Sequence, residues 1–409
     1  MDKQISIEQL RPGMFIHKLK GSWMDRLLWK SAFLLADPAE VKAIVDSGLR
    51  KVWIDTAKGR DVPVVEAVIE VLQDPAPTIT EVTEVMPPAV ATQVSFAEEL
   101  GRAAKICSKA KGVVTAMFHE ARMGKALEVG KAQQLVEEIS SSVERNPAAL
   151  ISLARLKTKD DYTYMHSVAV CGLMVSLGRQ LGLDPAQVRD AGLAGLLHDM
   201  GKMAIPLEVL NKPGKLTEDE YTQVKTHPEQ GHAMLLEGNN VNLVVLDVCL
   251  HHHERIDGRG YPHRLKGDEI SVFAKMAAVC DVYDAITSNR PYKEGWDPAE
   301  SLQKMARWSK GDYEEHIFQA FVKSIGIYPT GSLLLLDSGR LCIVVEQSQG
   351  SLLQPKVKAF FSTRSKSYIP PELIDLSQRG RAEEIVGPET AAKWGIKNMD
   401  ELWAGDALR

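Results

Sequence analysis

Histidine is unevenly distributed along this chain of 409 residues, because 8 of its 11 histidines fall between His166 and His263. This stretch lies within a longer segment, 147–325, whose apolar residues recur at the three- and four-residue spacing of packed helices. Histidine is the commonest metal ligand in proteins and the commonest general acid or base. The pattern predicts a mainly helical core in which several helices bring imidazoles to one site.

The string His-His-His-Glu-Arg-Ile-Asp-Gly-Arg-Gly-Tyr-Pro at 251–262 is the most informative part of that segment. Three consecutive histidines on a helix spread over roughly 200°, so they cannot all face solvent. Two neighbouring imidazoles can therefore reach two different metal ions. Gly258, Gly260 and Pro262 then require a tight loop, which is typical of a loop that closes over a ligand.

Three shorter pieces supply further ligand types. His198 and Asp199 follow an apolar helix and offer a nitrogen and a hard oxygen, a combination suited to Fe, Mn or Zn. Gly201 is predicted to end that helix, so that Lys202 turns back toward the site. His227 precedes a helix start, where its side chain can point across a site. His166 lies on an inward helical face, although a core histidine bonded to a carbonyl is an alternative for that residue alone.

A helix is also predicted over 273–288, with Asp281 and Asp284 on one face. Two carboxylates on a mostly apolar helix are costly unless cations or donors bind them. Arg290 and Lys293 follow this helix. The first can bind a phosphate with two parallel hydrogen bonds and the second can act as a point charge, with a solvated surface cluster as the alternative.

Seven side chains are therefore predicted metal ligands: His166, His198, Asp199, His227, His252, His253 and Asp281. Seven ligands are too many for one tetrahedral zinc. They fit two octahedral ions bridged by an aspartate and a hydroxide, which typically lie about 3.5–4 Å apart and clamp an in-line displacement at phosphorus.

The HDxGK string at 198–202, the HHExxDGxGYP string at 252–262 and the 281–293 region resemble the HD-GYP family, a bacterial branch of the HD-domain metal-dependent phosphohydrolases. The resemblance covers about 150–325. It implies an all-helical HD-type core and a phosphodiesterase of second-messenger signalling. The implied substrate is cyclic di-GMP, opened to pGpG and in some members cleaved on to GMP.

The resemblance also implies roles for individual residues. Asp199 is the bridging ligand and, with Lys202, a catalytic residue, and Lys202 contacts the scissile phosphate. Further substrate contacts are the loop residues Gly260, Tyr261 and Pro262, with Arg290 and Lys293. Some members hold a third metal with a glutamate where this chain has Tyr162, so two divalent ions are expected here, either Fe or Mn.

Two alternatives to a cyclic di-GMP phosphodiesterase stay open at this point. One is a catalytically silent cyclic di-GMP receptor, and the other is a phosphodiesterase for another cyclic dinucleotide such as cyclic GMP-AMP. Diguanylate cyclase (GGDEF) proteins and a second copy of the chain are the expected macromolecular partners.

The rest of the chain suggests three further parts. Residues 1–93 are predicted to form a smaller α/β domain of unknown function with a linker, and 94–145 a helical connector. The HD-GYP domain then occupies 146–328. A small β-rich unit fills 329–409, although its tail from Glu383 has helical composition. Inside the first part we expect a strand at 52–54, helices at 38–47 and 62–72, and a linker at 74–93.

Composition excludes several classes of protein. The net charge of −5 argues against a nucleic-acid polymer as ligand, since such binding requires an excess of Lys and Arg. Five scattered cysteines without a CxxC pair are typical of a reduced, intracellular protein. The start lacks the apolar core of a signal peptide, and the chain has no run of about 18 apolar residues. We therefore expect a cytoplasmic protein.

Overall fold

The computed structural model describes residues 2–6, 10–19, 33–35, 41, 51–59, 93–125, 128–157, 161–238, 241–289, 295–348, 351–378 and 383–405. The chain divides into two compact units, Met1–Thr92 and Gln93–Arg409, and each is described by itself. No helix in the described ranges combines the length and the apolar character needed to cross a membrane.

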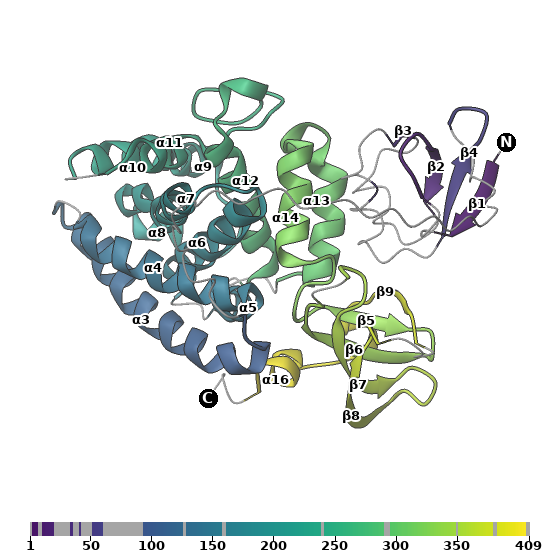
Figure 1. The fold of residues 1–409 in the computed structure, drawn as a ribbon. Coiled ribbons are helices and arrows are strands. Elements are labelled where there is room, and N and C mark those ends of the chain that lie inside the picture. Colours follow the sequence, from purple (N-terminus) through teal and green to yellow (C-terminus); the bar gives the residue numbers. More distant parts are fainter. Residues whose placement is uncertain are drawn as a thin grey trace, which may run out of the picture. The chain divides into compact units, whose positions relative to one another are not determined.

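The N-terminal unit contains a four-stranded antiparallel sheet in the order β1-β4-β2-β3 (Figure 1). Its strands are β1 (Asp2–Ser6), β2 (Phe15–Leu19), β3 (Phe33–Leu34) and β4 (Lys51–Asp55). The strand predicted at 52–54 is confirmed as part of β4. The predicted helices at 38–47 and 62–72 and the linker at 74–93 lie, apart from Val41 and Gln93, outside the described residues.

The second unit is built around helices, as predicted (Figure 1). The longer ones are α3 (Phe96–Arg122), α4 (Val129–Arg145), α5 (Pro147–Arg155), α6 (Tyr162–Gln180), α7 (Pro185–Leu197), α10 (His227–Leu236), α11 (Leu243–His251), α12 (Val272–Thr287), α13 (Pro298–Asp312) and α14 (Glu315–Ile325). Shorter ones are the 3-10 turns η2 (Met200–Ala204) and η3 (Gly267–Glu269), with α8 (Leu207–Leu210) and α9 (Glu218–Val224). This arrangement is the all-helical HD-type core.

Local sequence explains where several of these helices begin. Ser95 and Thr217 form capping boxes with the glutamates three residues on. Asn146 separates α4 from α5, and Pro147 occupies the first turn of α5, where a missing N–H is harmless.

Helix α6 is the centre of the helical core. Every residue from 165 to 178 is buried, so this helix is covered on all sides rather than along one stripe. It packs against α3, α4, α5, α7, α12 and α14. A polar side chain on α6 therefore points into the protein and needs a partner there, which applies directly to His166.

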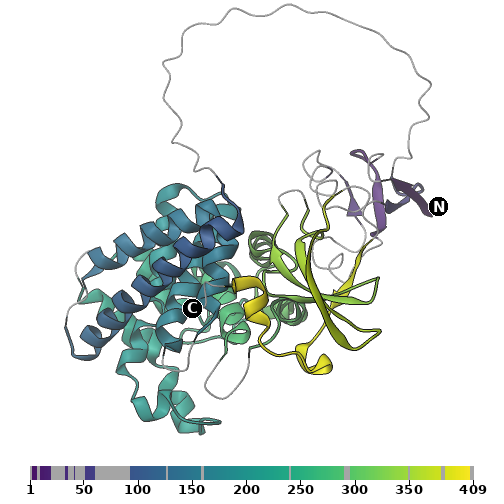
Figure 2. The same ribbon diagram turned by 90° about the horizontal axis from the view of Figure 1, so that it is seen from below.

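A five-stranded antiparallel sheet follows the helices, in the order β8-β7-β6-β5-β9. Its strands are β5 (Leu333–Leu336), β6 (Arg340–Glu346), β7 (Lys356–Ser362), β8 (Ser367–Asp375) and β9 (Ile385–Pro388), and two short helices follow, α15 (Ala391–Trp394) and α16 (Met399–Ala404). Figure 2 shows α16, in yellow, between the helices and this sheet. Its Trp403 packs edge-to-face on Phe96 of α3, with ring centroids 6.2 Å apart.

The tail prediction is wrong at its start. The stretch from Glu383 was expected to be helical, yet Ile385–Pro388 forms β9 and pairs with β5 about 50 residues earlier in the chain. Local composition favours helix in this tail, but pairing with an otherwise open sheet edge overrides a weak local preference. The expected helical structure appears only afterwards, in α15 and α16.

Candidate metal centre

Five separate segments bring the seven predicted ligands together. His166 lies in α6, His198 and Asp199 follow α7, His227 is the first residue of α10, His252 and His253 follow α11, and Asp281 lies in α12. All are buried except His253, which is half-buried. The helical core thus gathers side chains that are far apart in the chain.

Asp199 lies at the centre of this cluster. Its Oδ2 atom is 3.5 Å from Nε2 of His166 and 3.4 Å from Nε2 of His198. Its Oδ1 atom is 3.3 Å from Nε2 of His227 and 3.8 Å from Nε2 of His252. One oxygen of a single carboxylate therefore faces one pair of imidazoles, and the other oxygen faces a second pair.

Asp281 is the second carboxylate of the cluster. Its Oδ1 atom lies 3.0 Å from Nε2 of His166 and 3.9 Å from Nε2 of His198. Its Oδ2 atom lies 3.8 Å from Nδ1 of His253. Asp281 thus also stands between imidazoles that belong to different parts of the cluster.

Backbone carbonyls orient three of the imidazoles. Each Nδ1–H group donates to a carbonyl oxygen three or four residues earlier in the chain: His198 to Gly195 at 2.8 Å, His227 to Val224 at 2.7 Å and His252 to Val248 at 3.1 Å. With Nδ1 engaged in this way, the lone pair lies on Nε2, which faces Asp199. Such fixing of the tautomer is typical of metal-binding histidines.

His166 is oriented by a carboxylate instead. Its Nδ1 atom lies 2.6 Å from Oδ2 of Asp284, which also accepts a hydrogen bond from Lys157. The hydroxyl of Ser288 donates to the other oxygen of Asp284 at 3.1 Å. Asp281 and Asp284 share a helical face, as predicted, but the first lies in the cluster and the second behind it. Sequence reasoning flagged Asp284 as a buried carboxylate without finding this role, and it missed Lys157 altogether.

Two buried atoms of the cluster have no hydrogen-bond partner among the described residues: Nε2 of His198 and Oδ1 of Asp199. Leaving a buried polar atom unpaired costs about 1–3 kcal/mol, more for a charged group. The possible ligand atoms also form two sets, each within 4.8 Å: Asp199 with His227, His252 and His253, and Asp199 with His166 and His198. The orphaned atoms and the mixed nitrogen and oxygen donors fit bound cations.

The electrostatics of the cluster keep three of the predicted ligands, His252, His253 and Asp199, in the protonation states that metals require. Burial lowers the pKa of His253 to about 3. Burial and the neighbouring imidazoles hold the pKa of His252 well below its usual range. Burial also raises the pKa of Asp199, but Lys202 and His198 outweigh it and hold that pKa well below the ordinary value. At neutral pH, His252 and His253 are thus neutral and Asp199 is ionised. Burial lowers the pKa of His166, but Asp281 and Asp284 outweigh it and raise that pKa overall.

Lys202 reaches the cluster as predicted, and its Nζ forms an ion pair with Oδ2 of Asp199. The prediction that Gly201 ends the helix before it is wrong, however. Helix α7 ends at Leu197, and Gly201 lies inside η2. A Cβ atom at Gly201 would lie 1.9 Å from the carbonyl oxygen of His227. The glycine is therefore needed for the close approach of η2 to α10, which positions His227 beside Asp199.

We expect Gly201→Ala to lower the free energy of unfolding by about 3 kcal/mol or more, because backbone atoms on both sides must move apart. Urea unfolding of the metal-free protein measures this. Gly101→Ala is the matched control, since nothing lies within 4 Å of a Cβ at that helical position. Alanine there should raise stability by up to about 1 kcal/mol. Equal stability of Gly201→Ala and the unaltered chain would contradict the close-approach explanation.

Glu254 anchors the loop that follows the three histidines, a role that sequence reasoning did not assign. Its carboxylate is 3% exposed and accepts backbone hydrogen bonds from the three residues after Pro262: His263 at 2.7 Å, Arg264 at 3.0 Å and Leu265 at 3.1 Å. A Cβ on Gly260 would lie 2.5 Å from the backbone nitrogen of Arg255. The unusual residues of this string thus build one compact loop.

Tyr261 connects that loop with the cluster. Its ring stacks on the imidazole of His253, with centroids 4.7 Å apart and planes 27° apart. Tyr261 is half-buried, so part of its surface faces outward beside the cluster. It can therefore form one wall of a substrate site.

Some residues of interest lie elsewhere. The imidazole of His251 contacts Asp247 at 2.7 Å and His263 at 3.0 Å, away from the cluster. This agrees with its omission from the predicted ligands. Arg290 and Lys293 fall outside the described residues.

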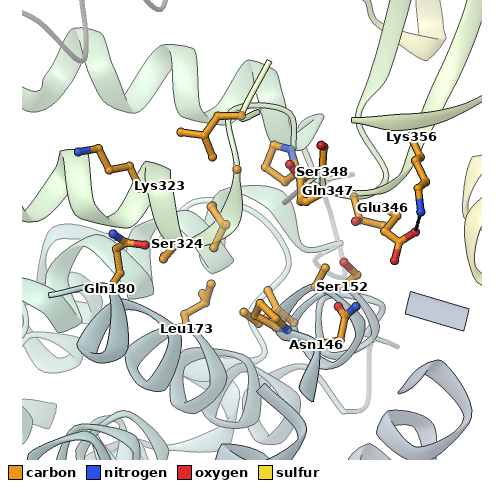
Figure 3. Close-up of a pocket in the computed structure, with 18 of the residues that line it drawn as sticks. Asn146, Ser152, Leu173, Gln180, Lys323, Ser324, Glu346, Gln347, Ser348 and Lys356 are labelled. Atoms are coloured by element: carbon orange, nitrogen blue, oxygen red, sulfur yellow. Dashed lines mark hydrogen bonds and ion pairs between the residues drawn. The ribbon is translucent and has the colours of Figure 1, made fainter. Parts of the chain in front are cut away.

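A cavity of about 940 Å³ lies behind the cluster, between the helices and the C-terminal sheet. Figure 3 shows Ser152 and Leu173 on the helical side and Glu346 and Lys356 on the sheet side. The cluster histidines are not among its lining residues, although Asp284 is. The cavity is thus separate from the space that the seven ligands face.

Comparison with known protein families gives two matches. An HD domain matches residues 138–317, and a domain of unknown function (DUF3391) matches residues 2–132. The first contains every residue of the cluster. The second includes the N-terminal sheet and extends into α3 and α4.

Three curated proteins illustrate what the chain is similar to. Cyclic di-GMP phosphodiesterase PA4108 of Pseudomonas aeruginosa is 52% identical over 406 residues, which is 99% of this chain and 96% of the relative. The response regulator RpfG of Xanthomonas campestris, also named a cyclic di-GMP phosphodiesterase, is 43% identical over 40% of this chain and 44% of its own. The 3'3'-cGAMP-specific phosphodiesterase 1 of Vibrio cholerae is 34% identical over 46% and 42%.

Proposed function

Because this chain belongs to the HD-GYP family of HD-domain phosphohydrolases, we propose that it is a metal-dependent phosphodiesterase that hydrolyses cyclic di-GMP to pGpG. The proposal is supported by a relative with that activity in its name that aligns along almost the whole chain. Cleavage of the second diester, to give GMP, is a further step that the same site could perform.

The observation on which this proposal depends is the position of Asp199 between two sets of imidazoles. A carboxylate that offers one oxygen to each set is the arrangement expected of a bridging ligand in a two-metal site. We assign His166 and His198 to one ion and His227, His252 and His253 to the other, with Asp199 shared. Asp281 completes the coordination beside His166.

Such ions supply Lewis acidity and lower the pKa of a bound water toward neutrality. The mixed imidazole and carboxylate donors suit Fe or Mn. The protein's own residues do the rest. Lys202, already beside Asp199, can donate to a non-bridging phosphate oxygen and stabilise its developing charge. Tyr261 covers one face of the His253 imidazole.

We further propose that Gly260, Tyr261 and Pro262 contact the substrate, together with Arg290 and Lys293. The loop residues stand beside His253 through the stacking of Tyr261. The two cations come from the segment that directly follows α12, the helix of Asp281. Guanidinium and ammonium groups there would hold the phosphates of the dinucleotide in line.

A cyclic GMP-AMP substrate is the second candidate, because a relative at 34% identity is named for that activity. The metal cluster determines the reaction type, whereas the bases are read by other contacts. Anaerobically purified, metal-loaded full-length protein should therefore be given both cyclic dinucleotides side by side, with product identification by mass spectrometry. Faster formation of pGpG supports the proposal. If the protein bound either compound but hydrolysed neither, it would be a receptor, and the proposed phosphodiesterase activity would be overturned.

Asp284→Asn should lower metal affinity by about 10–100-fold. A neutral amide orients the imidazole of His166 less firmly than the carboxylate does, and it makes that imidazole a weaker base. The buried ammonium of Lys157 also loses its carboxylate partner. Titration of the metal-free protein with Mn²⁺ measures the affinity. Asp247→Asn is the matched control, since Asp247 holds His251, which lies outside the cluster. Equal affinities for the two variants would contradict a positioning role for Asp284.

A further inference from the structure

A lysine that the mechanism above does not use lies beside the cluster. The Nζ atom of Lys225, which follows α9, is 4.5 Å from the ring centroid of Tyr221 and 5.6 Å from that of Tyr261. A cation at these distances from two aromatic rings is held by attraction to both. Lys225 is therefore positioned by the protein rather than free to sample solvent.

Tyr261 links this lysine with the metal cluster. The ring of Tyr261 is close both to Nζ of Lys225 and to the imidazole of His253. Burial raises the pKa of Tyr261, and the negative charge of Asp281 raises it further. Tyr221, Lys225 and Tyr261 thus form a continuous surface that begins at a predicted metal ligand and extends outward; we call it the outer wall.

Lys225 and Lys202 differ in how their charges are paired. Lys202, the other lysine at the cluster, pairs with Asp199. Lys225, in contrast, has no carboxylate within 4.0 Å in the described parts of the chain, and its side chain is half-buried. Tyr221 is 50% exposed, so part of its ring is accessible to a ligand. The outer wall therefore offers one cation and one aromatic face.

A cyclic dinucleotide needs both of these groups. It has two phosphates and two purine bases, and only one phosphate can react at the cluster at a time. Lys225 lies over Tyr261 rather than over the metal ligands, so it is placed for the phosphate that is not reacting. An exposed tyrosine ring beside a lysine is a typical platform for a stacked base.

We propose that Lys225 binds the second, non-reacting phosphate of the cyclic dinucleotide and that Tyr221 stacks on one of its bases. This inference rests on the proposed function. These residues would then select a cyclic dinucleotide over a simple phosphodiester. They act on substrate binding and not on the reacting atoms.

The test uses Lys225→Met, Tyr221→Ala and Tyr221→Phe in the metal-loaded full-length enzyme. For cyclic di-GMP, the first two should raise KM by about tenfold and leave kcat within about twofold, because they remove binding that is equal in ground and transition states. Tyr221→Phe keeps the ring and should behave as the unaltered enzyme. Hydrolysis of bis(4-nitrophenyl) phosphate, which has one phosphate, should be unchanged by Lys225→Met.

Lys215→Met is the matched control, because Lys215 is an exposed lysine just before α9 and should leave both substrates unaffected. An unchanged KM for cyclic di-GMP in Lys225→Met and Tyr221→Ala overturns the inference while the proposed function stands. Equal losses with both substrates, or a loss of bound metal, also overturn it, since they indicate a structural role. Absence of turnover in the unaltered enzyme would instead refute the proposed function and this inference with it.

Discussion

Asp199→Asn is expected to lower turnover of cyclic di-GMP by at least about 10³-fold, the largest effect of any substitution considered. The carboxylate of Asp199 contacts imidazoles of both sets, through different oxygens. An amide of the same shape has no negative charge and only one oxygen. It can therefore neither bridge two cations nor reduce the repulsion between them, and bound metal should fall from the two ions that we propose to at most one per chain.

Turnover and metal content are measured on the same preparation, by product chromatography and elemental analysis. The fold should survive, because Lys202 is 24% exposed and can reach water when its partner is lost. Asp268→Asn is the matched control, since it makes the same chemical change on a fully exposed side chain and should alter neither quantity. Full metal content with near-normal turnover in Asp199→Asn would refute a bridging role.

Metal loading should have the second-largest effect, on stability. A ligand that binds only the folded state stabilises it by about 4 kcal/mol when its free concentration is about 1,000-fold above Kd. Folding of the metal-free chain buries the unpartnered Nε2 of His198 and Oδ1 of Asp199, both of which an ion would satisfy. The free energy of unfolding should therefore rise with the logarithm of the Mn²⁺ concentration.

Urea unfolding of chelated protein with increasing Mn²⁺ tests this expectation. The free energy of unfolding of Asp199→Asn should depend much less on the Mn²⁺ concentration. Lys215→Met changes an exposed lysine that is not a predicted ligand, so it should keep the full dependence. If unfolding midpoints of the unaltered chain were identical with and without Mn²⁺, the cluster would not be a metal site.

Much of the fold followed from local patterns. Apolar spacing of three and four residues predicted the helical core, and the strand predicted at 52–54 lies in β4. These signals are local, since they depend on residues within one or two turns. The strand at Ile385–Pro388 was missed because its stability comes from pairing with β5, which no local window contains.

For the candidate site, too, some features follow from the sequence and others only from the tertiary structure. The sequence by itself determined the chemical types of the ligands and the motif strings in which they occur. It could not determine that the two oxygens of Asp199 face different imidazole pairs, that Asp284 and Lys157 support His166, or that Gly201 permits the approach of η2 to α10. Those relations join segments far apart in the chain, and only the packing of helices around α6 sets their distances and orientations.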